Sequence, residues 1–67
     1  MIQVTVNGAA QRFERSIPVS DLLARMSLAG KKLAVERNGE IVPRSAHTQT
    51  MLNDGDQLEI VVAVGGG

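Results

Sequence analysis

The chain has 67 residues, which is enough for one small domain but not for a second domain or a deep cofactor cavity. Apolar residues make up 43% of the chain and charged residues 21%, so we expect a packed core, and with Phe13 as the one aromatic residue this core must be aliphatic. Seven basic and seven acidic residues cancel, which argues against a nucleic-acid or anionic-membrane binder, while the lack of cysteine excludes disulfides, thiolate metal sites and thiol nucleophiles.

The first fifteen residues predict a β-hairpin. Residues 1–6 alternate apolar and polar side chains with the period of two that is typical of a half-buried strand. The Asn-Gly pair at residues 7–8 is a turn signal. We expect the second strand at residues 11–15, with Phe13 turned inward between charged neighbours.

The segment SIPVSDLLARMSLAG, residues 16–30, predicts a short helix. Ser20 is the expected N-cap, Asp21 favours the positive end of the helix dipole, and Gly30 is expected to end the helix. Three apolar residues share one face of this helix: Leu22, Leu23 and Met26. Because a helix of roughly two turns is marginal alone, it needs a sheet to pack on.

The second half of the chain predicts three more strands. Two short ones, at residues 33–37 and 40–42, flank the Asn-Gly pair at residues 38–39, and Pro43 closes the second of them. Residues 44–52 look irregular, with one helical turn. After a tight turn, the last strand is expected at residues 57–64, with the following side chains on its core face: Leu58, Ile60, Val62 and Val64.

This order of elements predicts an α+β fold in which one helix covers one face of a mixed, four- to five-stranded sheet. The first and last strands are the longest and most apolar, so we place them side by side in the middle of the sheet. This is the β-grasp, or ubiquitin-like, arrangement. We expect a β-grasp domain at residues 1–64 and a flexible glycine tail at residues 65–67.

No group of residues predicts a catalytic or metal site, so we do not expect an enzyme. His47 is the one histidine, and a lone histidine in a loop is expected at the surface. Asp54 and Asp56 resemble a carboxylate pair, but around Gly55 they are ordinary turn residues. A metal site would need more ligands than the chain gathers anywhere.

The unusual feature of the sequence is the run of Gly65, Gly66 and Gly67. A carboxylate is a poor acyl electrophile, so a chain that uses its C-terminus must have it activated by another enzyme, most directly as an acyl-adenylate. Glycine suits entry into a narrow activating site because it has no Cβ that would clash. The alternative is a frayed end or the remnant of a tag.

The strand before the glycines predicts a docking surface. Its outward residues change from polar to apolar toward the tail, so we expect docking of a partner at Val61, Ala63 and Val64. The alternatives are a strand buried on both faces or a scattered exposed valine. Residues 48–67 carry three acidic residues and no basic one, to which a basic partner surface would be complementary, unless these are ordinary solvated charges.

Four segments together carry a resemblance over the whole chain: MIQVTVNG, VSDLLARM, LAVERNGEIVPRS and DGDQLEIVVAVGGG. The more specific parts are VERNGEIVPR and the DGD turn that leads to VGGG. With these segments the chain resembles the ThiS family, small ubiquitin-like β-grasp proteins that carry sulfur in thiamine biosynthesis. The glycine tail alone is shared with other ubiquitin-like carriers.

The resemblance implies that the Gly67 carboxylate is adenylated with ATP and Mg by a ThiF-type enzyme and converted to a thiocarboxylate by a sulfur donor system. The sulfur then passes to the thiazole ring built by the thiazole synthase ThiG, while Gly65 and Gly66 give access. The carrier itself would bind no cofactor. Family tails often end in two glycines rather than three, which leaves the register of the threaded tail open by one residue. Neither Arg44 nor His47 receives a role.

Two other functions stay open at this point. The small subunit of molybdopterin synthase uses the same tail chemistry, but it is usually longer and richer in aromatic residues. A β-grasp interaction module that only binds RNA or protein is the other alternative, and the absence of an aromatic stacking platform counts against RNA. The sequence has no apolar run of membrane-spanning length and no signal-peptide pattern at its start, so we expect a cytoplasmic protein.

Overall fold

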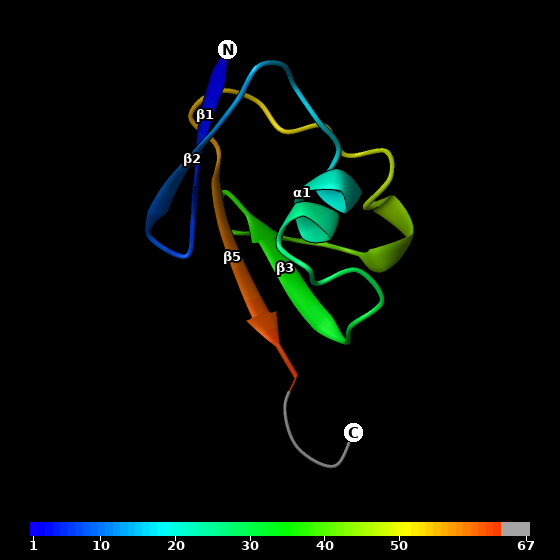
Figure 1. The fold of residues 1–67 in the computed structure, drawn as a ribbon. Coiled ribbons are helices and arrows are strands. Elements are labelled where there is room, and N and C mark those ends of the chain that lie inside the picture. Colours follow the sequence, from blue (N-terminus) through cyan, green and yellow to red (C-terminus); the bar gives the residue numbers. More distant parts are fainter. Residues whose placement is uncertain (64–67) are drawn as a thin grey trace.

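The computed structural model describes residues 1–63, which form one mixed five-stranded sheet with one α-helix across one of its faces (Figure 1). The elements in chain order are β1 (Ile2–Val6), β2 (Ala9–Phe13), α1 (Val19–Arg25), β3 (Leu33–Arg37), β4 (Glu40–Val42), the 3₁₀ turn η1 (Arg44–Ala46) and β5 (Gln57–Val62). The strands lie in the order β2-β1-β5-β3-β4. The expected β-grasp fold is therefore confirmed.

The first and last strands lie side by side, as predicted. β1 and β5 are parallel neighbours, whereas β2 pairs with β1, and β3 with both β4 and β5, in antiparallel fashion. β5 is consequently the central strand, with β1 on one side and β3 on the other. A parallel pair requires a crossover, and α1 lies within the connection that leads from β1 back to β5.

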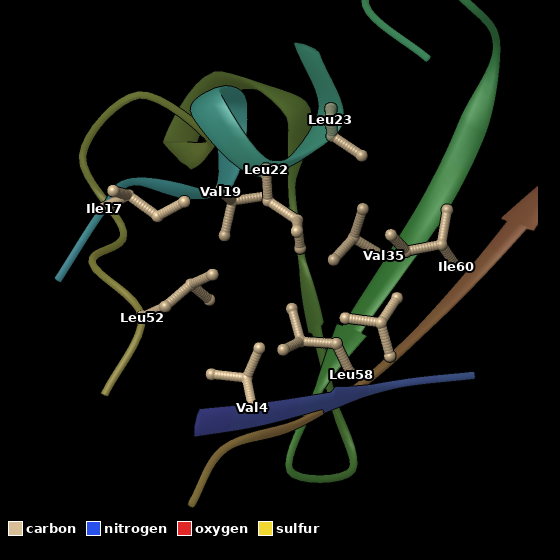
Figure 2. Packing of buried hydrophobic residues seen from close by; sticks show 10 residues of the cluster. Val4, Ile17, Val19, Leu22, Leu23, Val35, Leu52, Leu58 and Ile60 are labelled. Atoms are coloured by element: carbon tan, nitrogen blue, oxygen red, sulfur yellow. The ribbon is translucent and has the colours of Figure 1, made fainter. Parts of the chain in front are cut away.

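The core lies between α1 and the sheet (Figure 2). Its buried members are Val4, Val6, Ile17, Val19, Leu22, Leu23, Val35, Leu52, Leu58 and Ile60. All are aliphatic, as the composition predicts, and Leu22 and Leu23 point from α1 toward the sheet. Met26 and Phe13 are half-buried and pack against this cluster, so the predicted apolar helix face is also confirmed.

Two tight turns set the register of the hairpins. Asn7 and Gly8 have φ values of 49° and 84°, and Asn38 and Gly39 have 51° and 86°, which is the doubly left-handed backbone of a type I′ turn. In the first hairpin Val6 therefore pairs directly with Ala9. The prediction of a second strand at residues 11–15 was wrong by two residues, because a two-residue turn returns the chain to the sheet at once.

The helix boundaries also differ from the prediction. α1 begins at Val19 after Pro18, with no side-chain cap, so Ser20 is inside the helix rather than its N-cap. The Ser20 N–H donates to the carbonyl of His47 at 2.9 Å, so a distant loop replaces the cap. At the other end the helix stops at Arg25 and Ser27 takes a left-handed backbone, φ 60°, so the helix ends before Gly30, its predicted end.

The remaining predictions have mixed outcomes. β3 and β4 have the predicted bounds, and η1 is the single helical turn expected within residues 44–52. The prediction that His47 lies at the surface was wrong: its side chain is 8% exposed and its Nε2 lies 3.1 Å from the carbonyl oxygen of Val42. Within residues 1–63, no helix is long and apolar enough to cross a membrane. The predictions for Val64 and for the glycines at residues 65–67 lie outside the described residues.

Candidate functional site

The candidate site is the open face of the sheet where β5 leads to the glycine tail. Along β5, Leu58 and Ile60 are buried against the helix, whereas Gln57, Glu59 and Val61 are exposed on the opposite face. This alternation confirms the predicted facing of the strand. Val61 is 65% exposed, a large fraction for a valine, and the predicted docking residue Ala63 is exposed as well.

Neighbouring strands extend this apolar surface. Ala34 of β3 pairs directly with Val61, so their side chains lie next to each other on the open face. Ile41 of β4 is on the same face and is 62% exposed. We call this surface the outer patch; its members are Ala34, Ile41, Val61 and Ala63. The sequence argument found Val61 and Ala63 but missed the other two, because only the strand pairing brings β3 and β4 to that place.

Two carboxylates border the outer patch. Glu36 of β3 and Glu59 of β5 are directly opposite each other in the register, and both line a shallow hollow with Thr5 and Gln57. Like charges in this position destabilise a sheet. In the part of the chain that the structure describes, neither glutamate forms an ion pair. A positively charged group from a partner would relieve this repulsion, which makes the pair complementary to a basic surface.

The surroundings of Ala63 are not acidic, in contrast to what the charge distribution along the sequence suggests. Ala63 donates its N–H to the carbonyl of Lys32 at 2.9 Å, and exposed Lys31 and Lys32 precede β3 at this point. These two lysines line a small pocket together with Arg44 and His47. The two lysines precede Ala63 by about thirty residues in the sequence, but the antiparallel pairing of β3 with β5 places them beside it.

Asp56, at the other end of β5, has a structural function. Its side chain is 8% exposed and accepts hydrogen bonds from the Asn53 N–H at 2.8 Å and the Asn38 side chain at 3.0 Å. The Arg37 Nε lies 3.3 Å from the same carboxylate. The expectation of an ordinary turn residue therefore understated Asp56, which joins the last turn to the β3–β4 hairpin. The DGD turn was the signal in the sequence, but its partners are long-range.

Asn7 holds the middle of β5. Its side-chain oxygen accepts from the Ile60 N–H at 2.7 Å, and its side-chain nitrogen donates to the Ile60 carbonyl at 3.1 Å. The amide thus takes the place of a backbone peptide group in the sheet. Sequence reasoning used Asn7 only as a turn residue and missed this contact.

No alternative chemistry arises elsewhere in the described residues. Across residues 1–63, no three His, Cys, Asp or Glu side chains come close enough together to hold a metal ion. His47 and Asp56, the two buried polar residues, bond to the chain itself. The described residues thus provide a sheet with an exposed outer patch, and β5 is the last strand before the predicted residues Val64, Gly65, Gly66 and Gly67, which lie outside the described part.

A five-stranded mixed sheet in this order, with one helix on one face, defines a small ubiquitin-like β-grasp protein. The ThiS family matches residues 4–67, nearly the whole chain, and the chain belongs to this family. It is 45% identical over 63 residues to the sulfur carrier protein ThiS of Bacillus subtilis, a match that covers 92% of this chain and 96% of the relative.

Two further comparisons agree. A crystal structure of the thiamine biosynthesis protein ThiS from Geobacter metallireducens superimposes with a TM-score of 0.82 at 35% identity, covering 98% of this chain and 100% of the other. The chain is also 46% identical over 66 residues to a thiazole synthase of Paramagnetospirillum magneticum. That match covers 98% of this chain but only 20% of the relative, so the chain spans about a fifth of the length of these larger proteins.

Proposed function

We propose that this chain is a sulfur carrier that supplies sulfur for the thiazole ring in thiamine biosynthesis. The observation that carries the proposal is the family match, which extends from residue 4 through the final glycines at residues 65–67. The Bacillus subtilis relative of nearly the same length is named as a sulfur carrier, and the larger relatives as thiazole synthases. These thiazole synthase matches favour the thiamine pathway over the small subunit of molybdopterin synthase.

In the proposed reaction the chain is a co-substrate rather than an enzyme. The Gly67 carboxylate attacks the α-phosphorus of ATP in a ThiF-type enzyme and releases pyrophosphate, which gives an acyl-adenylate. Sulfide-level sulfur from a donor system then displaces AMP at the carbonyl carbon and leaves a thiocarboxylate. ATP and Mg belong to the activating enzyme. We place these steps in the cytoplasm, because they consume ATP, and a ThiG-type thiazole synthase as the acceptor.

The outer patch is the proposed docking surface for the activating enzyme. Val61 and Ala63 are exposed beside the start of the tail, and Ala34 and Ile41 widen the apolar area. Val64, which lies outside the described residues, stays a predicted member. Ordering the three glycines in a partner's site costs on the order of 1–2 kcal/mol per residue, and burial of the patch would offset that cost. The Glu36–Glu59 pair favours a basic residue on the partner.

The test is the intact mass of the chain after incubation with ATP, magnesium, a ThiF-type enzyme and a sulfur donor. We expect one oxygen atom to be replaced by sulfur, and a fragment spectrum that assigns the change to Gly67. The matched control carries one additional alanine after Gly67; it should fold normally and gain no sulfur. An unchanged mass of the original chain, or equal conversion of the extended chain without prior trimming, contradicts the proposal. The mass of the protein from cells also establishes whether Gly67 is its last residue.

A further inference from the structure

The two edges of β5 differ in its second half. The Ala63 N–H donates to the Lys32 carbonyl, and the Asn38 N–H donates to the Gln57 carbonyl. The odd-numbered residues of β5 therefore direct their N–H and C=O groups toward β3. Hydrogen bonding alternates along an antiparallel pair, and the even-numbered residues therefore direct their N–H and C=O groups to the opposite edge, where β1 lies.

β1 covers only the first half of that opposite edge. The Asn7 N–H donates to the Leu58 carbonyl at 2.9 Å, after which the chain turns away into β2. The Asn7 side chain then bonds both the N–H and the carbonyl of Ile60, and this amide is the last partner that β5 meets on this side. Figure 1 shows β5 continuing past the β1–β2 hairpin with β3 alone beside it.

Val62 is the next residue after Ile60 whose backbone groups point to the β1 side, and it lies beyond the reach of the Asn7 side chain. Its side chain is half-buried on the face of β5 that carries Leu58 and Ile60, and it pairs with Leu33 at a position where no hydrogen bonds are exchanged. Within residues 1–63, no partner reaches its N–H or C=O on the β1 side. A rigid strand edge with unpaired backbone groups is a template for another extended chain.

We propose that an extended segment of the protein that takes up the tail pairs with β5 at Val62 and adds a strand to the sheet. The identity of this partner rests on the proposed function; the open edge does not. Backbone hydrogen bonds would supply affinity and alternate side chains specificity, as in other cases of strand addition. Pairing here directs the partner's backbone along the chain toward residues 64–67, which places the tail in register for the partner's active site.

The side chains beside the edge identify the kind of segment that fits. Val61 and Ala63 flank Val62 in the chain and lie on the open face of the sheet, and Glu59 precedes them on the same face. A segment that places apolar side chains beside Val61 and Ala63, and that carries next to Asn7 a lysine or arginine long enough to reach Glu59, matches this order. The occupant is therefore an extended, largely apolar segment with one basic side chain rather than a helix.

The experiment uses a chemically synthesised full-length chain in which the amide between Val61 and Val62 is replaced by an ester, which removes the Val62 N–H alone. The probe is a purified ThiF-type enzyme without ATP, and the dissociation constant is measured by calorimetry. We expect binding to weaken by about tenfold, the loss from removing one partner of a buried hydrogen bond. In parallel, the Val62 amide of the unmodified chain should exchange with deuterium at least about tenfold more slowly in the complex.

The matched control is an ester in place of the Ala10 N–H. Ala10 pairs with Thr5 on the edge strand β2, away from the outer patch, and its N–H points to the outer edge of the sheet. Each ester also makes the carbonyl of the preceding residue a weaker hydrogen-bond acceptor within the sheet. Both esters should therefore lower the melting temperature equally, whereas only the Val62 ester should weaken binding. Equal binding by both esters together with an unprotected Val62 amide overturns the inference, and so does an unmodified chain that does not bind the enzyme.

The outcomes separate this inference from the proposed function. A chain that gains sulfur at Gly67 but leaves Val62 unprotected in the complex refutes strand addition and keeps the carrier function. A chain that protects Val62 but gains no sulfur refutes the carrier function and keeps strand addition. Protection of Val62 that increases with the concentration of the free chain would identify a second copy as the occupant, and the assignment to the enzyme would then be wrong.

Discussion

The two halves of β5 have the same extended conformation but different neighbours. The first half, from Gln57 to Ile60, is held by β1 on one edge and β3 on the other, with the amides of Asn7 and Asn38 as additional clamps. The second half, Val61 and Val62, pairs with β3 alone and carries exposed Val61, and Ala63 follows it. One strand thus has a structural half and an interaction half. Changes in the first half should affect stability, and changes in the second should affect binding.

The largest effect on stability is expected from Asp56→Ala. The buried carboxylate accepts hydrogen bonds from two groups and faces Arg37, so its removal leaves Arg37 and the Asn53 N–H without their partner. We expect a loss of about 3 kcal/mol in the free energy of unfolding, measured by urea denaturation. The matched control is Asp54→Ala in the same turn, because exposed Asp54 accepts one bond, from the Gln3 N–H. It should lose no more than about 1 kcal/mol, and equal losses would refute the structural role of Asp56.

A smaller effect is expected from Asn7→Gly. Glycine keeps the left-handed backbone of the turn, φ 49° at this position, and removes only the two side-chain bonds to Ile60. The free energy of unfolding should fall by about 1–2 kcal/mol. Hydrogen exchange gives the sharper result: the Ile60 amide should lose protection, whereas the buried neighbour Leu58, which β1 still covers, should keep it. An Ile60 amide that stays protected would show that Asn7 does not close this edge.

The fold was predictable from the sequence where short-range chemistry determines it. The Asn-Gly turns at residues 7–8 and 38–39 and the alternation of residues 57–62 each define an element without reference to the rest of the chain. The pairing of β1 with β5 in the middle of the sheet followed from their length and apolar character. The bounds of β2 and α1 were less predictable, since a two-residue turn and a carbonyl from the loop at His47 determine them.

The candidate site was only half predictable for the same physical reason. Val61 and Ala63 were identified because the facing of a strand is a local property. Ala34 and Lys32 reach the site only through the pairing of β3 with β5, about thirty residues away in the sequence. Asn7 and His47 were misjudged because their partners are distant in the sequence. The Asn7 side chain bonds to Ile60, and the His47 carbonyl accepts from the Ser20 N–H.

The smallest effect on stability, with the clearest effect on binding, is expected from Val61→Asp. Val61 is 65% exposed and its side chain faces away from the core, so the substitution should change the free energy of unfolding by less than about 1 kcal/mol. Binding to a ThiF-type enzyme should nevertheless weaken by about tenfold or more, because a carboxylate would replace an apolar contact beside Glu59.

Val61→Thr separates shape from charge in this experiment. Threonine keeps the branched shape and the strand preference of valine, and it should therefore weaken binding less than aspartate does. A second control, Ala10→Asp on the edge strand β2, adds the same charge to an exposed site on the open face, away from the outer patch. If Val61→Asp unfolds the chain, its side chain is needed in the core; if it binds like Ala10→Asp, the outer patch is not the docking surface, and the interaction half of β5 is limited to its backbone edge at Val62.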